Sequence, residues 1–256
     1  MKVVLLAGGL GTRMREETEF RPKPMVEVGG KPVLWHIMKI FAAYGHTDFI
    51  ICAGYKGEQI KNYFYNYAAM NMDFTLTLGD SESATFHRSH DEFDWTVTVA
   101  DTGPDTPTGG RINKIKRYLG DEPFFCTYGD GIAPVPIDEL VNAYKRSEKT
   151  AMVTLARPPS RFGIVRFDSD NIVQSFEEKP RIDAKVSIGY FIFGPGIFEY
   201  LTDDSVLESS ILPLLVERQE LAAFEYSGFW QAMDTQRELQ LLQEMWTEPN
   251  PPWKVW

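Results

Sequence analysis

The chain contains few cysteines and few histidines among its 256 residues. Its two cysteines, Cys52 and Cys126, sit inside apolar runs, as buried free thiols usually do, and they lack the spacing of a metal site. The four histidines have no spacing that suggests a metal site or a catalytic pair. No Ser-His-Asp or Cys-His arrangement can be traced, so nothing supports catalysis through a serine or cysteine nucleophile.

The chain also lacks long hydrophobic runs and concentrated basic charge. Residues 1–9 offer one lysine and a short apolar run that ends in glycines, too short for a signal peptide or a spanning helix. The formal net charge is −10, and no basic stripe is present. We therefore expect a soluble, cytoplasmic protein that binds neither nucleic acid nor membrane.

What the chain does have is a clear alternation of strand and helix patterns. Continuous apolar runs at 2–7 and 48–54 predict buried parallel strands, and helical spacing at 33–45 and 57–68 predicts helices. This order is typical of an α/β sheet with crossover helices. We expect one α/β domain spanning residues 1–256.

The rest of the chain predicts further strands, helices and a small antiparallel elaboration. Residues 74–80 and 95–101 alternate apolar residues with threonine, which predicts half-exposed antiparallel strands. More strands are predicted at 123–131, 151–157, 163–168, 172–180 and 187–195. More helices are predicted at 112–120, 136–147 and 235–247.

The strongest local signal is the glycine loop GGLGTRM, residues 8–14. Its glycines allow a ligand to approach the backbone, whose N–H groups can hold phosphate oxygens, and Arg13 adds a cation suited to a triphosphate. The loop is neither a Walker A motif nor GxGxxG, because Met14 occupies the third glycine position. A purely structural tight turn is the alternative.

Three charged residues in distant motifs suit phosphate chemistry. Lys23 lies between two prolines in RPKPM, which limits how its side chain is presented. A rigid lysine near the glycine loop could stabilise the charge that develops on phosphorus during phosphoryl transfer. The alternative is that RPKPM is only a stiff surface loop. Asp130 in YGDG and Asp234 in the apolar FWQAMDT come from opposite halves of the chain and could share one Mg²⁺.

Two further motifs extend this set. Glu178 and Lys179 end a predicted strand in FEEKP, and TGGR supplies Gly109 and Arg111 after a loop, where backbone could line a base pocket. Each motif alone is weak, because charged strand ends and glycine turns are common in surface loops.

In this order, LLAGGLGTR, PKPM, GDG and EEKP resemble the sugar-nucleotide pyrophosphorylase family, and REET and GFWQAMDT resemble its CTP-using members. The resemblance covers nearly the whole chain. It implies a Rossmann-like nucleotidyltransferase (GT-A-like) fold with a mixed central sheet flanked by helices. It also implies a homo-oligomer, a hexamer, that transfers a cytidylyl group from CTP to a sugar 1-phosphate, preferably α-D-glucose 1-phosphate, with Mg²⁺ as cofactor.

The resemblance also assigns roles to residues. Those implied as catalytic are Arg13, Lys23, Asp130 and Asp234, the last two also holding Mg²⁺. Those implied to contact the nucleotide are Leu6, Ala7, Gly8, Gly9, Gly11, Thr12, Gly109, Arg111 and Tyr128. Those implied to contact the sugar phosphate are Glu178, Lys179, Ser187 and Gly189. The N-terminal half would form the nucleotide side and the C-terminal half the sugar side.

Several positions depart from the family pattern. Arg21 replaces the usual lysine, Ser187 and Ile188 replace Asn-Gly, and Ser210 and Ile211 replace Glu-Pro. The change at Arg21 is mild for a phosphate contact. We expect the changes at Ser187, Ile188, Ser210 and Ile211 on the sugar side, where a bulky isoleucine and a lost asparagine would alter hydroxyl recognition.

Alternatives therefore stay open. The substrate could be a modified or deoxygenated sugar 1-phosphate, or the nucleotide dTTP or UTP. A catalytically silent nucleotide-binding homologue is the alternative that is not an enzyme. A Rossmann dehydrogenase would require the GxGxxG motif that this chain lacks.

Overall fold

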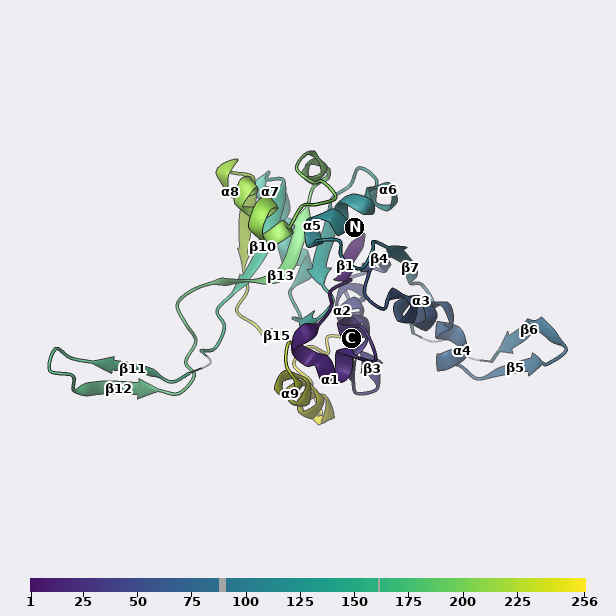
Figure 1. Ribbon diagram of the computed structural model, residues 1–256, viewed down its shortest axis with the longest axis horizontal. Coiled ribbons are helices and arrows are strands. Elements are labelled where there is room, and N and C mark those ends of the chain that lie inside the picture. The colour runs from purple at the N-terminus through teal and green to yellow at the C-terminus, as the bar shows by residue number, and fades with distance from the viewer. Residues whose placement is uncertain (88–90, 161) are drawn as a thin grey trace.

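The computed structural model describes residues 1–87, 91–160 and 162–256, and a seven-stranded mixed sheet forms its centre (Figure 1). The strand order is β14-β10-β13-β8-β1-β4-β7. In chain order these strands are β1 (Val3–Ala7), β4 (Asp48–Ala53), β7 (Thr96–Asp101), β8 (Phe124–Tyr128), β10 (Ala151–Ala156), β13 (Val186–Phe193) and β14 (Leu221–Glu225). Only β13 runs antiparallel to its neighbours, so the carboxyl ends of β1 and β8 share one edge of the sheet.

Helices cover both faces of this sheet. The alternate residues of β1 enter two different apolar clusters, Val3 and Leu5 on one face and Val4 and Leu6 on the other. The first cluster is covered by α2 (Val33–Ala42), α3 (Gly57–Tyr65), α7 (Ile137–Ser147) and α9 (Gln236–Thr247). The second is covered by α5 (Thr108–Lys114), α6 (Lys116–Leu119) and α8 (Leu212–Glu217). Burial on both faces explains why β1 reads as a continuous apolar run.

Shorter elements complete the chain. The helical ones are α1 (Arg15–Thr18), α4 (Tyr67–Asn71), the 3₁₀ turns Thr12–Met14, Lys23–Met25 and Pro195–Glu199, and a π-helix at Leu207–Ile211. Two small hairpins are β2 (Glu27–Val28) with β3 (Lys31–Pro32), and β9 (Gly131–Ile132) with β15 (Gln231–Ala232). Within the described ranges, no helix combines the length and apolarity needed to cross a bilayer.

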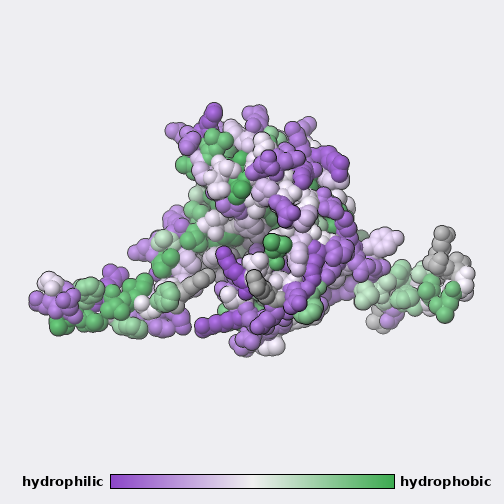
Figure 2. All heavy atoms as spheres, viewed as in Figure 1, coloured by the Kyte–Doolittle hydropathy of each residue, from purple (hydrophilic) through white to green (hydrophobic). Residues whose placement is uncertain are grey.

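Two hairpin arms project from opposite sides of the body (Figure 1). One is β5 (Phe74–Thr77) with β6 (Asp80–Phe86), and the other is β11 (Ile164–Phe167) with β12 (Val173–Glu177). Both carry apolar side chains in the open, which Figure 2 shows as green patches. The exposed residues are Phe74, Leu76, Leu78 and Phe86 on the first arm, and Val165, Phe167, Ile172, Val173 and Phe176 on the second. Isolated two-stranded hairpins of this kind are marginally stable alone.

The C-terminal tail is anchored on α2 by a buried histidine. The indole Nε1 of Trp253 donates to His36 Nδ1 at 3.3 Å, and His36 Nε2 bonds the Val28 carbonyl at 2.9 Å. Burial lowers the pKa of His36 to about 4, so its ring is neutral near pH 7 and can accept this bond. The tail and α9 are thereby held against β2.

The α/β fold with a mixed sheet and a small antiparallel elaboration is confirmed. The predicted strands at 2–7, 48–54 and 123–131 are β1, β4 and β8. The prediction for residues 95–101 is wrong, because β7 pairs in parallel with β4 as an edge strand of the central sheet. The strand is only partly covered, with Thr96 exposed and Thr98 partly exposed, and this imitates the alternation of an antiparallel strand.

Candidate active site

A cavity of about 390 Å³ opens at the carboxyl ends of β1 and β8. Its lining combines the glycine loop with charged residues from distant parts of the chain: Leu6, Ala7, Gly8, Gly9, Gly11, Thr12, Arg13, Lys23, Pro24, Thr106, Pro107, Thr108, Arg111, Tyr128, Gly129, Asp130 and Asp234. Every residue predicted for catalysis or the nucleotide is in this set except Gly109. We call this space the glycine-loop cavity.

Lys23 joins the two aspartates at the floor of the glycine-loop cavity. Its Nζ donates to Asp130 at 2.6 Å and to Asp234 at 2.5 Å, and the residue is only 9% exposed. Burial lowers the pKa of Lys23, but the charges and hydrogen bonds of Asp130 and Asp234 outweigh it and raise that pKa overall. The ammonium is therefore charged, and it holds two carboxylates close together.

The start of α9 fixes Asp234. The backbone N–H groups of Asp234 and Thr235 donate to Glu238 Oε2 at 2.7 and 2.8 Å, and the Glu238 N–H donates to the Thr235 hydroxyl at 3.3 Å. This capping box orders the first turn of the helix. Arg13 reaches Asp234 from the glycine loop at 3.3 Å and is largely exposed. The Asp234 carboxylate therefore pairs with both Arg13 and Lys23.

The two aspartates can bind a metal ion only if further ligands come from water or a bound molecule. No group of three or more histidine, cysteine, aspartate or glutamate residues with metal-binding geometry occurs in the described part of the chain. Asp130 and Asp234 bind one ammonium nitrogen, so both could also reach one small cation. Such a cation would need further oxygen ligands from water or a bound phosphate, which is usual for Mg²⁺.

Arg111 braces the glycine loop from below. It is 4% exposed, and its guanidinium donates to the carbonyls of Gly8 and Pro104 at 3.0 Å, to the carbonyl of Gly103 at 2.7 Å and to the Thr102 hydroxyl at 2.7 Å. A Cβ atom at Gly8 would lie 2.1 Å from this guanidinium. A side chain at position 8 would therefore displace this buried guanidinium, apart from any effect on a ligand.

Tyr128 closes the cavity on the side of β13. Its hydroxyl donates to Glu208, whose other carboxylate oxygen accepts from the Thr108 hydroxyl at 2.7 Å. Burial, followed by Glu208, raises the pKa of Tyr128, so the phenol stays a donor. The Tyr128 ring packs on Gly189, which has φ +79° and no room for a side chain. This glutamate bridge sets the distance between α5 and β8.

The structure does not bring the remaining predicted sugar residues into the glycine-loop cavity. Glu178 and Lys179 are exposed at the base of the β11–β12 arm, where they pair with each other at 3.1 Å. Ser187 is exposed at the start of β13 and bonds the Gly189 N–H at 3.3 Å. Their roles stay predictions.

Four positions have structural explanations that sequence reasoning missed. The side chain of Ile188 is 4% exposed and lies in the core, so the expected extra bulk in a sugar pocket is wrong. Ile211 is likewise buried, and the Ser210 hydroxyl bonds the backbone of Val206. Gly109 packs against the Ser205 carbonyl instead of lining the cavity. Close packing accounts for Ile188, Ile211 and Gly109. Hydrogen bonding to the backbone at the start of its helix accounts for Ser210.

The cavity also contains residues that sequence reasoning did not select, namely Pro24, Thr106, Pro107, Thr108 and Gly129. Residues 106–108 (TPT) lead directly into the glycines of TGGR and the helix that carries Arg111. This position was the signal in the sequence that could have pointed to them as cavity residues. The Thr106 hydroxyl bonds the Thr102 carbonyl and Lys114, which places the loop over the cavity.

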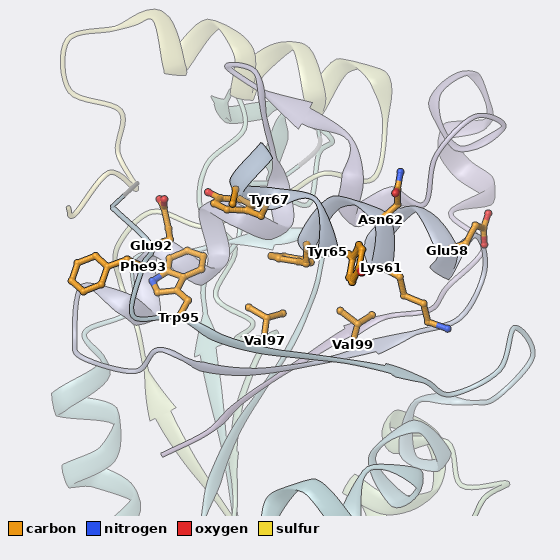
Figure 3. Close-up of a pocket in the computed structure, with 12 residues that line it drawn as sticks. Glu58, Lys61, Asn62, Tyr65, Tyr67, Glu92, Phe93, Trp95, Val97 and Val99 are labelled. Carbon is orange, nitrogen blue, oxygen red and sulfur yellow. The ribbon is translucent and has the colours of Figure 1, made fainter. Parts of the chain in front are cut away.

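A larger cavity of about 820 Å³ lies elsewhere, along the edge strand β7 (Figure 3). Aromatic side chains of α3, α4 and the segment before β7 surround it, including Tyr65, Tyr67, Phe93 and Trp95, with Val97 and Val99 of β7 facing them. It has no glycine loop, and its lysine, Lys61, pairs with Asp101 at 3.2 Å. This cavity lacks the features of an anion site.

Comparisons with known proteins agree with the geometry. The profile of the family described as "Nucleotidyl transferase" matches residues 2–235. The chain is 44% identical to a glucose-1-phosphate cytidylyltransferase of Salmonella typhi and 40% identical to a probable one of Bacillus subtilis, with all of each chain covered. The solved structure of HddC from Yersinia pseudotuberculosis shares the fold, with a TM-score of 0.67 at 21% identity, covering 96% of this chain and 99% of HddC.

The packing of Arg111 on the glycine loop predicts different costs for two neighbouring substitutions. Gly8→Ala should reduce the free energy of unfolding in urea by about 2–3 kcal/mol, because the new Cβ displaces a buried guanidinium from its carbonyl partners. Gly9→Ala is the matched control, since a Cβ there meets no atom within 4 Å, and it should change stability by less than about 0.5 kcal/mol. Equal effects of the two substitutions would refute the bracing role of Arg111.

Proposed function

Since the chain belongs to the nucleotidyl transferase family, we propose that it transfers a cytidylyl group from CTP to a sugar 1-phosphate, preferably α-D-glucose 1-phosphate, and releases pyrophosphate. Its full-length relatives named for this activity support the choice of CTP. The single observation that carries the proposal is Lys23 held between Asp130 and Asp234 beside the glycine loop. We also propose that residues 1–256 act as one catalytic domain, with the nucleotide on its N-terminal side.

The cations of the cavity suit a triphosphate. The Arg13 side chain is 75% exposed and has Asp234 as its carboxylate partner, whereas Lys23 is buried between two carboxylates. We propose that the backbone N–H groups of the glycine loop bind phosphate oxygens while Arg13 folds over them. Arg111 keeps the loop in this conformation and adds positive charge beneath it.

Asp130 and Asp234 would hold Mg²⁺, and their closeness to each other fits a single ion completed by phosphate oxygens. When bound, Mg²⁺ neutralises phosphate charge and polarises the phosphorus that is attacked. Lys23 lies within reach of the same phosphates and would shift from the carboxylates toward the charge that develops on them.

The reaction itself needs no nucleophile from the protein. A phosphate oxygen of the sugar 1-phosphate forms a bond to the α-phosphorus of CTP, while the bond from that phosphorus to pyrophosphate breaks. The sugar phosphate oxygen is already ionised near pH 7, so no general base is required. Catalysis then rests on alignment and on charge neutralisation by Arg13 and Lys23.

The function is tested by measuring pyrophosphate release with Mg²⁺, crossing CTP, dTTP and UTP with several sugar 1-phosphates. CTP with glucose 1-phosphate should give the highest kcat/KM. Lys23→Ala and Asp130→Ala should each lower kcat by at least about 100-fold, because each removes charge stabilisation at the reacting phosphorus. Lys145→Ala on α7 is the matched control for the loss of a lysine, and it should leave kcat unchanged.

Two results would decide against the proposal. No release with any pair would favour a catalytically silent nucleotide-binding homologue. A preference for dTTP or UTP would keep the chemistry but reject the choice of base.

We further propose a homo-oligomer, a hexamer, assembled through the two arms. Phe74 lies opposite Phe86 on one arm and Val165 lies opposite Phe176 on the other, so exposed apolar side chains gather on a face of each hairpin. A two-stranded hairpin has no core of its own for them to enter, and burying them against another copy would be favourable. The aromatic cavity along β7 is lined partly by α4, which leads into the β5–β6 arm (Figure 1). A cytoplasmic location, where CTP is present, stays a prediction.

Sedimentation velocity tests the arms directly. The double variant Phe167→Asp with Phe176→Asp on the β11–β12 arm should shift the protein to smaller assemblies, because it places charge in the proposed contact. Val216→Asp on α8 is the control, since Val216 is a comparably exposed apolar residue on the body (61%). An unchanged sedimentation coefficient for the arm variant would contradict the proposal.

A further inference from the structure

The threonine of the REET motif, Thr18, is hydrogen-bonded to the glycine loop. Thr18 is 3% exposed, and its hydroxyl Oγ1 donates to the carbonyl oxygens of Gly11 and Met14, each at 3.0 Å. The bond to Met14, four residues earlier, is common for a threonine in a helical turn. The bond to Gly11, seven residues earlier, is not explained by the helix, and it ties the end of α1 to the loop.

The backbone of Gly11 packs closely on the Thr18 side chain. Gly11 has φ +62°, and a Cβ atom there would lie 2.7 Å from the methyl carbon Cγ2 of Thr18. The same Cβ atom would lie 3.2 Å from the Cβ atom of Lys23. Gly11 therefore lies against both residues, and Thr18 supports the part of the loop that is next to the lysine held by the two aspartates.

The turn between β4 and α3 holds the segment that carries Thr18. Side chains of this turn and of the start of α3 donate to three successive carbonyls, those of residues 18–20: Tyr55 at 3.2 Å, Lys56, and Gln59 at 2.6 Å. Tyr55 also donates its backbone N–H to the Gly8 carbonyl at 3.2 Å. The Thr18 segment and the start of the glycine loop are therefore fixed to the same turn, which keeps the hydroxyl in place relative to the loop.

The bond from Thr18 sets the direction of the peptide group between Gly11 and Thr12. In a planar trans peptide, the C=O of one residue and the N–H of the next point in opposite directions. Because the Gly11 carbonyl points at Thr18, the Thr12 N–H points away from it. Thr12 is exposed and lines the glycine-loop cavity, whereas Thr18 does not line it. Thr12 also begins a 3₁₀ turn, so its N–H has no partner within that turn and is available to a ligand.

We propose that Thr18 is a positioning residue for the triphosphate: its hydroxyl fixes the Gly11 carbonyl and thereby directs the Thr12 N–H at a phosphate oxygen of CTP. This inference rests on the proposed function and adds which side chain sets the conformation of the loop. Thr18 does not contact the substrate and acts through Gly11. Its loss should therefore weaken the binding of CTP and leave the binding of the sugar phosphate unchanged.

The variants Thr18→Val and Thr18→Ser separate the hydroxyl from the packing of the side chain. Valine keeps the shape and removes the hydrogen bond, so KM for CTP should rise about five- to tenfold, as expected for one weakened phosphate contact. KM for glucose 1-phosphate should stay unchanged. Serine keeps the hydroxyl, so Thr18→Ser should have a KM for CTP within about twofold of that of the unsubstituted protein. Calorimetric titration of CTP with Mg²⁺ should show the same pattern in Kd without turnover.

Two further variants separate positioning from folding. Thr154→Val on β10 is the matched control, because Thr154 is also buried but its hydroxyl has no hydrogen-bond partner among the described residues. It should leave both KM values unchanged. Tyr55→Phe removes only the side-chain bond to the Thr18 carbonyl, and it should raise KM for CTP about two- to threefold. If thermal unfolding shows that Thr18→Val is not folded at the assay temperature, Tyr55→Phe decides in its place.

The inference is overturned if folded Thr18→Val binds CTP as tightly as the unsubstituted protein does. It is also overturned if Thr18→Ser loses as much affinity as Thr18→Val, because the hydroxyl is then not the cause, or if both KM values rise equally, which indicates a general distortion. Binding of CTP by the unsubstituted protein without pyrophosphate release from any substrate pair would instead contradict the proposed function. In that case the calorimetric titrations still decide whether Thr18 positions the loop for the triphosphate.

Discussion

The site depends on one interaction, the ammonium of Lys23 held between Asp130 and Asp234. These residues come from an N-terminal loop, the end of β8 and the start of α9, and without a cation between them the two carboxylates would repel each other. The surrounding structure holds these three residues in position. Prolines flank Lys23, Met233 bonds the Asp130 carbonyl, and the capping box of α9 holds the backbone of Asp234. The tail anchored at His36 keeps α9 in place.

This arrangement also explains the charge balance of the glycine-loop cavity. Three cations, Arg13, Lys23 and Arg111, face two carboxylates, so the cavity carries excess positive charge within a chain of net charge −10. This excess of positive charge is local, and Arg111 contributes part of it. The Arg111 guanidinium donates hydrogen bonds to carbonyl oxygens and has no carboxylate partner among the described residues. A triphosphate with one divalent cation would restore balance, with Lys23 exchanging a carboxylate for a phosphate.

Sequence reasoning located the parts of the structure where local pattern and burial agree. β1, β4 and β8 are buried on both faces and read as apolar runs, and the glycine loop follows β1 as expected. It was wrong at residues 95–101, since an edge strand of a parallel sheet shows the alternation of an antiparallel one. It misjudged Ile188 because substitution patterns do not reveal which way a side chain points. It had no means of detecting that the Thr18 hydroxyl bonds the Gly11 carbonyl, because that contact depends on how the loop folds back.

The most direct test of the account is a titration of Mn²⁺, as a paramagnetic substitute for Mg²⁺, followed by electron paramagnetic resonance with and without CTP. With only two carboxylates and a lysine at the site, the account predicts weak binding of the ion alone and at least tenfold tighter binding when CTP supplies phosphate oxygens. Asp234→Asn should abolish that gain. Equally tight binding with and without CTP, or a gain that survives Asp234→Asn, would contradict the central claim.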